Sequence, residues 1–395
     1  MLRARSACGS EENEMTPRVL IFRSRLLPAS ETFIQAQAAA LTRYEPYFLG
    51  RKRVRGLALP AERQCVINES RLLGRVYDRM FTSNGYLPAR VRRELNGIRP
   101  ALVHAHFAVD GCLALPVARA LGVPLIVTMH GYDVTTSDAV FKRRSDRALR
   151  QFPERRATLF REAAQFIAIS NFIRASAERL GCPSERTRVL YIGIDEQRFT
   201  PATGERTRPL VLFVGRLVAK KGGEHLLNAM ALVQQQLPTA EVVLIGDGPL
   251  RQTLEAQARG LRNVTFLGAQ PPSIVREHLQ RAGVFCVPSI AAPNGDNEGL
   301  GMVFLEAQAS AVPVVSFDSG GVSEAVEQGV TGFLAPPGDD AALASHITRL
   351  LQDPELRQQM GRAGRARVEQ QFSLRRQTAL LENLYDEMVE TQRTR

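Results

Sequence analysis

Short apolar runs of strand length recur along the chain and alternate with stretches of helical pattern. The runs in the first half cover Val19–Phe22, Leu102–Ala105, Leu125–Met129, Phe166–Ile169 and Val189–Ile192. Those in the second half cover Leu210–Val214, Val242–Ile245, Val264–Leu267, Val284–Val287 and Val314–Phe317. Because these runs are apolar on both faces, they predict parallel sheets covered by helices on both sides. Each half is therefore expected to be a doubly wound, Rossmann-like α/β domain.

Helical periodicity and turn residues predict the domain borders. The clearest helical pattern follows Val214 and ends at Pro238. Its apolar face comprises Leu226, Leu227, Met230, Val233 and Leu237. The polar, proline-bounded segment Arg206–Pro209 is the predicted linker. Beyond Ser373 the pattern is a single amphipathic helix. We therefore expect a first domain over 15–204, a second over 205–372 and a final helix over 373–395.

Composition excludes several classes of protein. No run of about 18 apolar residues occurs in the 395 positions, so no membrane span is expected. Residues 1–14 are polar and lack the apolar core of a signal peptide; they are either a disordered tail or an artefact of a start that belongs at Met15. The five cysteines are scattered without a Cys-x-x-Cys pair, which suits a reducing cytoplasm and predicts neither disulfides nor zinc.

The net charge of +11 arises wholly within the first 200 residues. Its clusters include Arg51–Arg55, Arg90–Arg93 and Arg143–Arg156. One interpretation is attraction to an anionic surface, with anionic lipid favoured over nucleic acid because no aromatic interleaving or nucleic-acid motif accompanies the clusters. The other is an ordinary solvated surface in an arginine-rich proteome.

The segment Asn297–Ala307 carries the strongest chemical signal. It places Glu298 before the turn Gly299-Leu300-Gly301, and Glu306 in the helix that should follow. A glycine turn at a helix start offers bare backbone N–H groups to a phosphate. The two carboxylates flank that turn and can accept hydrogen bonds from sugar hydroxyls. This combination is what a protein needs to hold a nucleotide-sugar.

Two cations follow the predicted strand Leu210–Val214. Arg216 and Lys221 would lie at its carboxyl end, where they can neutralise a departing diphosphate. The chain has only four lysines, and two of them, Lys220 and Lys221, are adjacent here, which indicates a need for a compact ammonium group. An ordinary basic loop is the alternative.

Further turns follow neighbouring strands. Gly246 and Gly248 form a tight turn that allows close approach of a ligand, unless it is a plain strand-to-helix connection. After Ser319-Gly320-Gly321, the amides of Val322 and Ser323 are the expected donors of a second anion site, although helix capping would explain Ser323 equally well.

Histidines mark the first domain. His130 follows the strand Leu125–Met129 and is expected to project into a cleft facing the second domain. His104 and His106 are interpreted as mainly structural, because alternating strand residues would face opposite sides and no carboxylate lies at ligand spacing. The absence of Asp-x-Asp argues against a carboxylate-bound metal on the diphosphate, so no metal or other cofactor is expected. No P-loop motif occurs either.

As a set, these motifs resemble the nucleotide-sugar domain of family 4 glycosyltransferases of the GT-B fold. The motifs are Gly215-Arg216-Leu217-Val218 with Lys221-Gly222, Gly246-Asp247-Gly248-Pro249, Glu298-x₇-Glu306 and Ser319-Gly320-Gly321. In the first half, Pro28–Ile34, His104–Phe107 and His130–Asp133 resemble the branch that builds colanic acid and amylovoran exopolysaccharides. One departure is the loop Arg23–Glu31, which lacks the glycines that many relatives carry there.

The resemblance implies two domains facing an interdomain cleft, with the final helix crossing back to the first. It implies a UDP- or GDP-sugar donor on the second domain and retention of anomeric configuration. Arg216 and Lys221 would bind the diphosphate, Glu298 the transferred sugar and Glu306 the ribose, while His130 would reach the sugar from the opposite domain. Ser30 and Glu31 are assigned to the acceptor side.

The expected activity is transfer of a hexosyl group to a lipid-linked oligosaccharide in bacterial surface polysaccharide synthesis. The basic first domain would rest on the anionic cytoplasmic face of the inner membrane, with no nucleic-acid partner. The alternatives are another GT-B enzyme, such as a nucleotide-sugar epimerase, and a non-catalytic module that binds anionic lipid or nucleic acid. The sequence does not distinguish the donor base, the sugar or the acceptor.

Overall fold

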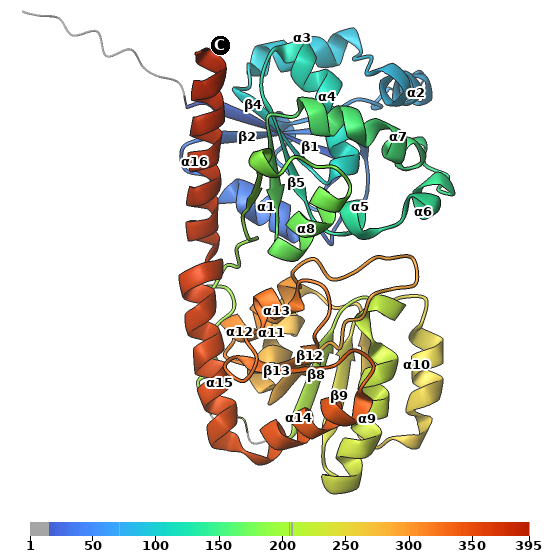
Figure 1. Cartoon of the computed structure of the whole chain (residues 1–395), viewed down its shortest axis with the longest axis vertical. Coiled ribbons are helices and arrows are strands. Elements are labelled where there is room, and N and C mark those ends of the chain that lie inside the picture. The colour runs from blue at the N-terminus through green and yellow to red at the C-terminus, as the bar shows by residue number, and fades with distance from the viewer. Residues whose placement is uncertain (1–15, 71, 205, 207, 395) are drawn as a thin grey trace, which may run out of the picture.

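The computed structural model describes residues 16–70, 72–204, 206 and 208–394. The segment expected to be a tail or a mis-started N-terminus, residues 1–14, lies outside the described residues. Two α/β domains are stacked along the long axis of the molecule, and two successive C-terminal helices run beside them, α15 (Pro354–Arg367) at the second domain and α16 (Leu374–Arg393) at the first (Figure 1). No helix in the described ranges is both long and apolar enough to cross a membrane.

The first domain is built on a parallel sheet of strand order β3-β2-β1-β4-β5-β6-β7. Its strands are β1 (Arg18–Leu26), β2 (Glu45–Arg53), β3 (Gln64–Val66), β4 (Leu102–His106), β5 (Leu125–Met129), β6 (Gln165–Ala168) and β7 (Thr187–Val189). Its helices are α1 (Thr32–Ala39), α2 (Gly74–Asn84), α3 (Ala89–Ile98), α4 (Ala108–Leu121), α5 (Tyr132–Thr135), α6 (Asp138–Lys142), α7 (Arg147–Glu162) and α8 (Asn171–Arg179). The order reverses between β1 and β4, which is where ligands bind in such sheets.

The second domain has a parallel sheet of order β10-β9-β8-β11-β12-β13. Its strands are β8 (Leu210–Val214), β9 (Glu241–Ile245), β10 (Val264–Gly268), β11 (Val284–Cys286), β12 (Val314–Phe317) and β13 (Gly332–Ala335). Its helices are α9 (Gly223–Gln236), α10 (Arg251–Gln257), α11 (Pro272–Arg281), α12 (Met302–Ala309), α13 (Val322–Ala325), α14 (Asp340–Gln352) and α15 (Pro354–Arg367). The topological switch point, where the strand order reverses, lies between β8 and β11.

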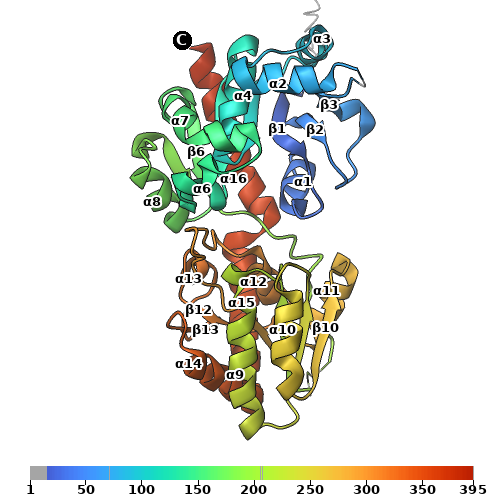
Figure 2. The ribbon, with the colours of Figure 1, turned by 90° about the vertical axis from the view of Figure 1, so that its right-hand side faces the viewer.

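The last helix, α16 (Leu374–Arg393), follows a π-helical turn at Val368–Phe372 and packs on the first domain (Figure 2). Leu381, Leu384 and Tyr385 are buried in a core shared with the first sheet. The Glu382 carboxylate accepts hydrogen bonds from the amides of Thr42 and Arg43. The predicted crossing-back helix is therefore confirmed, and so is the prediction of two doubly wound domains.

Most strand predictions agree with the structure, but one run is misplaced and β2, β3 and β13 correspond to no predicted run. The run Val189–Ile192 was expected to be a strand, but β7 spans Thr187–Val189. The sequence pattern missed β2, because Pro46 and the basic triplet at its end look like a solvated loop. In the fold Arg51 is buried, and its guanidinium pairs with Asp78 and Asp146. The interpretation of this cluster as free surface charge is therefore wrong for Arg51.

Candidate active site

Two loops of the second domain meet where β8 and β9 end. The Leu217 amide donates to the Asp247 carbonyl, and the Leu250 amide donates to the Leu217 carbonyl. Gly246 has φ of 141°, and a Cβ there would lie 1.8 Å from the Gly215 carbonyl oxygen. Glycine is thus required for the contact between these loops. Arg216 projects from the first of them; it is exposed and has no ion pair within the described residues.

The ammonium of Lys221 pairs with the carboxylate of Glu298. Ser289 Oγ also donates to Glu298, at 3.3 Å, and the neighbouring Lys220 pairs with Asp296 at 3.0 Å. Burial raises the pKa of Glu298, but the charges of Lys221 and Lys220 and the hydrogen bonds from Lys221 and Ser289 outweigh it, so the net shift is downward. Glu298 is therefore held as an anion beside a cation at the cleft.

The loop that carries Glu298 is held by the Ser319–Gly321 turn. The Gly321 amide donates to the Glu298 carbonyl at 2.8 Å, and Ser319 Oγ donates to Asn297 Oδ1 at 3.1 Å. A Cβ on Gly320 would lie 2.4 Å from the Glu298 carbonyl oxygen. The Val322 amide already donates to the Ser319 carbonyl, at 3.2 Å. The glycine pair thus supports the Glu298 loop. Of the two amides expected to bind an anion, those of Val322 and Ser323, the Val322 amide is already used inside the turn.

The predicted anion site before α12 has the required backbone. Gly301 has φ of 84°, and α12 begins at Met302. Within the described residues, no backbone hydrogen bond uses the amides of Leu300 or Gly301. The Leu300 side chain is buried, which anchors the turn and leaves its amide at the helix start. Unpaired backbone amides at a helix N-terminus are a common feature of phosphate sites.

Glu306 follows on the same helix and has a different environment from Glu298. Its carboxylate makes no ion pair or side-chain hydrogen bond to any other described residue. Burial raises its pKa to about 7, against the charges of Arg198 and Lys221, which lower it. A half-buried carboxylate with unused acceptor capacity and a perturbed pKa is a common mark of a binding site.

His130 lies across the cleft, directly after β5. A Cβ on Gly299 would lie 2.4 Å from the His130 carbonyl oxygen, so this turn and the Glu298 loop touch. Asp133 fixes the turn, because its carboxylate accepts hydrogen bonds from the amides of His130 and Gly131. The structure thus brings together His130 and the Glu298 loop, which are far apart in sequence.

The expectation that His104 and His106 face opposite sides of the sheet is wrong. Residues two apart on a strand share a face, and the two ring centroids lie 4.4 Å apart. His104 bonds to Tyr385 of α16 and to Thr128, whereas His106 Nδ1 lies 3.0 Å from His130 Nε2. The His-x-His spacing on β4 was the sequence signal that the two rings share a face, next to the end of β5 where His130 follows.

The loop after β1 is filled by internal ion pairs. Arg23 is buried and donates to both carboxylate oxygens of Glu31 and to Asp110. Ser30 is exposed beside this cluster. Glu31, assigned to the acceptor side from sequence, therefore has both oxygens engaged by Arg23. Asp110 was not identified from the sequence, because nothing in its local pattern marks it.

A contact between the domains was also not predicted. The carboxylate of Glu324 in the second domain accepts hydrogen bonds from the amides of Asn171 and Phe172, at the start of α8. Ser170 Oγ donates to the Gly299 carbonyl at 2.6 Å. These bonds hold the two sides of the cleft together. Their partners lie more than 120 residues apart, so no local pattern could reveal them.

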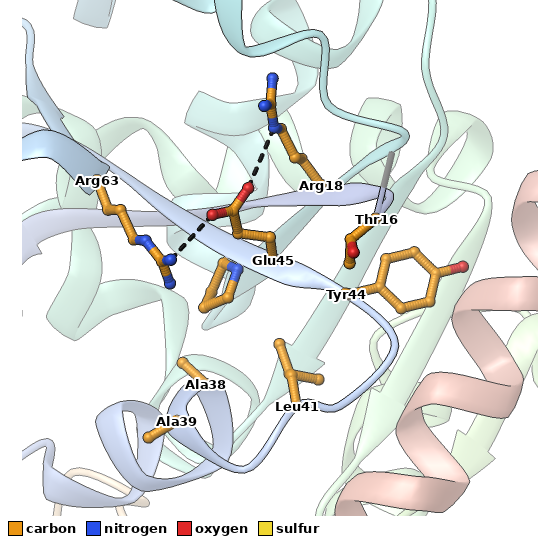
Figure 3. Close-up of a pocket in the computed structure, with 9 residues that line it drawn as sticks. Thr16, Arg18, Ala38, Ala39, Leu41, Tyr44, Glu45 and Arg63 are labelled. Carbon is orange, nitrogen blue, oxygen red and sulfur yellow. Dashed lines mark hydrogen bonds and ion pairs between the residues drawn. The ribbon is translucent and has the colours of Figure 1, made fainter. Parts of the chain in front are cut away.

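A pocket of about 480 Å³ lies away from this cleft (Figure 3). It is lined by Thr16, Arg18, Tyr44 and Glu45, at the amino ends of β1 and β2. The Glu45 carboxylate is bridged to Arg18 and Arg63. Ligands of doubly wound sheets bind at the opposite, carboxyl edge, so we assign the site to the interdomain cleft.

Two facing Rossmann-like domains, with cations and paired acids on the second and a histidine on the first, define a glycosyltransferase of the GT-B fold. Two family models cover most of the chain: "Glycosyltransferase Family 4" matches residues 36–198, and "Glycosyl transferases group 1" matches residues 195–367. The chain belongs to glycosyltransferase family 4.

Curated relatives of about 30% sequence identity differ in their named activities. Alpha-D-kanosaminyltransferase of Streptomyces kanamyceticus is 33% identical, over 69% of this chain and 72% of the relative. The amylovoran biosynthesis glycosyltransferase AmsK of Erwinia amylovora is 31% identical, over 73% and 70%. The putative colanic acid biosynthesis glycosyltransferase WcaL of Escherichia coli is 30% identical, over 68% and 66%. The resemblance to the exopolysaccharide branch is thereby confirmed.

Solved structures confirm the fold. Anabaena Alr3699/HepE in complex with UDP superposes with a TM-score of 0.77 at 20% identity, covering 94% of this chain and all of that one. The sucrose-phosphate synthase of Thermosynechococcus elongatus superposes with a TM-score of 0.73 at 21% identity, covering 95% and 100%.

Proposed function

We propose that this glycosyltransferase moves a hexosyl group from a UDP- or GDP-sugar to a hydroxyl of a lipid-linked oligosaccharide, with retention of anomeric configuration. The observation that carries the proposal is the Lys221–Glu298 pair, which faces the His130 turn and lies near the free carboxylate of Glu306. A nucleotide-sugar has a matching sequence of groups: sugar hydroxyls, a diphosphate and a ribose. HepE was solved with UDP, and several curated relatives are GDP-mannose-dependent, which supports both donor bases.

Each group has a role in this proposal. Arg216, Lys221 and the amides of Leu300 and Gly301 bind the diphosphate. Glu298 accepts hydrogen bonds from the transferred sugar, Glu306 accepts from the ribose, and His130 contacts the sugar from the first domain. The cations supply the charge that a metal ion would otherwise provide, so the proposed reaction needs no metal.

In the chemical step, the bond between the anomeric carbon and the diphosphate oxygen breaks with its electron pair staying on the diphosphate. The acceptor oxygen attacks the same face of the sugar, and its proton passes to the departing diphosphate oxygen. The products are a glycoside and a nucleoside diphosphate. The alternative is attack by a carboxylate nucleophile. Front-face attack by the acceptor is favoured because Glu298, the carboxylate assigned to the transferred sugar, is ion-paired with Lys221.

The first experiment is a thermal-shift screen of UDP- and GDP-sugars. A donor present at about 100 times its dissociation constant adds ~2.7 kcal/mol of stability. Glu306→Gln and Arg216→Ala should each reduce the shift for the donor that binds, and NMR of the product should show the anomeric configuration of the donor. No shift with any UDP- or GDP-sugar, or an inverted product, would contradict the proposal.

For the membrane surface we propose the basic segment Lys142–Arg150. Its cations are Lys142, Arg143, Arg144, Arg147 and Arg150, and none has an ion pair within the described residues. A contact with the second domain lies five residues before this segment, where the Ser137 amide donates to the Asn294 carbonyl. An acceptor held in an anionic bilayer would thus be delivered to the rim of the cleft, and the enzyme would work at the cytoplasmic face of the membrane.

Vesicle binding tests this surface. Each basic residue near an anionic bilayer contributes about 1 kcal/mol, so Arg143→Ser with Arg144→Ser should weaken binding to phosphatidylglycerol vesicles by about 10-fold or more. The control is Arg92→Ser with Arg93→Ser, two exposed arginines on α3 that make no ion pair with any described residue and lie at the far end of the first domain (Figure 1). Equal loss in both double variants would mean that net charge alone, without this segment, drives binding.

A further inference from the structure

Three histidines lie side by side beneath the cleft in the first domain. His104 and His106 come from β4, and His130 follows the adjacent strand β5. The His104 and His106 ring centroids lie 4.4 Å apart, and those of His106 and His130 lie 5.2 Å apart. His130 lies at the contact with the second domain, where its carbonyl faces Gly299, and no hydrogen bond joins His104 or His106 to a described residue of that domain.

His104 is fully satisfied by the fold. Its Nδ1 bonds to the Tyr385 hydroxyl at 2.6 Å, and its Nε2 bonds to Thr128 Oγ1 at 2.7 Å. Because Tyr385 belongs to α16, this histidine fastens the crossing-back helix to the sheet. Its role is structural.

His106 uses its Nδ1 differently, on His130 Nε2, at 3.0 Å. Burial lowers the pKa of both rings well below the usual value, and the neighbouring histidine rings and Arg23 lower it further. Two neutral imidazoles can form this bond only if one nitrogen carries the hydrogen and the other offers a lone pair. The proton position on His130 is therefore coupled to His106.

The other nitrogen of His130, Nδ1, is buried and has no hydrogen-bond partner within the described residues. Buried polar atoms are normally paired, and this one lies in the residue whose turn touches the Glu298 loop. Phe33 and Phe107 pack against the ring, with centroids 5.1 and 4.5 Å away. Those apolar walls hold the ring in place but cannot select its tautomer.

We propose that His106 is a positioning residue that fixes the tautomer and orientation of His130, so that Nδ1 of His130 is the nitrogen left for a hydroxyl of the transferred sugar. The sugar contact rests on the proposed function. The coupling between the two histidines does not, because it follows from the bond between them.

The direct test is ¹⁵N-histidine NMR of the full chain, which has only six histidines to resolve. His130→Asn assigns the His130 signals. Wild type should show one neutral tautomer at His130, and His106→Leu should shift its two nitrogen signals toward a mixture. His106→Asn, whose amide occupies the position of Nδ1, should restore a single tautomer. Tyr385→Phe is the matched control: it removes a bond to His104 and should leave the His130 signals unchanged.

A kinetic readout completes the test, using whichever UDP- or GDP-sugar gives a thermal shift. His106→Leu should lower donor turnover about 10-fold, the scale of one buried hydrogen bond, and His106→Asn should recover most of it. Unchanged His130 signals in His106→Leu would overturn the positioning role whatever the activity. If no donor binds but the signals shift as expected, the proposed function fails while the histidine coupling stands.

Discussion

The loops that follow β1 and β8 occupy the same topological position in their two sheets, yet they are built in opposite ways. Each strand lies at the point where its sheet reverses order. After β8, Gly215, Gly222 and Gly223 allow tight turns, and Arg216 stays exposed. No glycine occurs from Arg23, near the end of β1, to Glu31, and Leu27 takes a left-handed φ of 38° instead. One switch point is open to a ligand, whereas the other is closed by its own side chains.

Electrostatics explain the closed loop. Burial lowers the pKa of Arg23, but Asp110 and Glu31 outweigh it and the net shift is upward. Burial raises the pKa of Glu31, and Arg23 opposes that rise. The Arg23 guanidinium is shared by the two carboxylates and lies 4.2 Å from the centroid of the Phe107 ring. The loop thus supports the first domain, and the anion-binding task falls to the second.

The largest expected effect is on the stability of the closed loop. Asp110→Ala leaves the buried Arg23 short of a partner and should lower the unfolding free energy by about 3–5 kcal/mol. Thermal and urea unfolding measure the change. The control is Asp296→Ala. Asp296 pairs with Lys220 and is more exposed than Asp110, so its loss should lower the unfolding free energy by at most ~1 kcal/mol. Similar losses from both would mean that the β1 loop is no more dependent on its charges than the open one.

The next effect is on catalysis at the open loop. Lys221→Ala removes the cation that would stabilise the leaving diphosphate and should lower donor turnover about 10²–10³-fold. Lys220→Ala, the adjacent lysine that pairs with Asp296, should lose only a few-fold, since no diphosphate contact is assigned to it. Full donor turnover by Lys221→Ala would contradict the proposal that Lys221 stabilises the leaving diphosphate.

The sequence predicted the open loop better than the closed one. Arg216, Lys221 and His130 were predicted to lie at the cleft because each follows a strand whose apolar run is unambiguous, and Glu298 was singled out because it precedes a glycine turn at a helix start. The strands β5, β8 and β12 were predicted to the residue for the same reason. Such motifs are local, and topology alone brings the carboxyl ends of parallel strands to one edge.

What the sequence could not reveal are the pairings between distant segments. Lys221 and Glu298 were assigned separate ligands, yet they bind each other across 77 positions. Arg51 looked solvated because its partners, Asp78 and Asp146, lie on other elements. Charge pairing depends on tertiary contacts, so a count of basic residues overestimates the free positive surface.

A smaller effect concerns pH and the open side of the cleft. The Glu306 pKa of about 7 in the fold exceeds the ordinary value of 4.5. Between these values the folded chain binds the proton more tightly than the unfolded one, so stability falls as pH rises from about 4.5 through 7. Glu306→Gln should flatten this dependence and raise stability above pH 7 by about 1–3 kcal/mol, since each pKa unit corresponds to about 1.4 kcal/mol.

Melting curves at pH 5 and pH 8 measure that difference. Donor affinity gives the complementary readout, because ribose hydroxyls donate best to the ionised carboxylate. The affinity of wild type should rise as pH increases through 7, and the affinity of Glu306→Gln should not. Parallel profiles for the two proteins would show that Glu306 does not titrate at the ribose position.

The last comparison is between two exposed arginines, Arg216 after β8 and Arg25 near the end of β1. Arg216→Ala should weaken donor binding by about 1.5–3 kcal/mol, the value of a hydrogen bond to a charged group. Arg25→Ala, in the β1 strand end, should change it by less than ~0.5 kcal/mol, as is usual for a surface side chain. Titration of both variants with the same nucleotide-sugar measures the two values. Equal losses would mean that the diphosphate contacts both switch points, and that Arg25 takes the place of the glycines absent from the β1 loop.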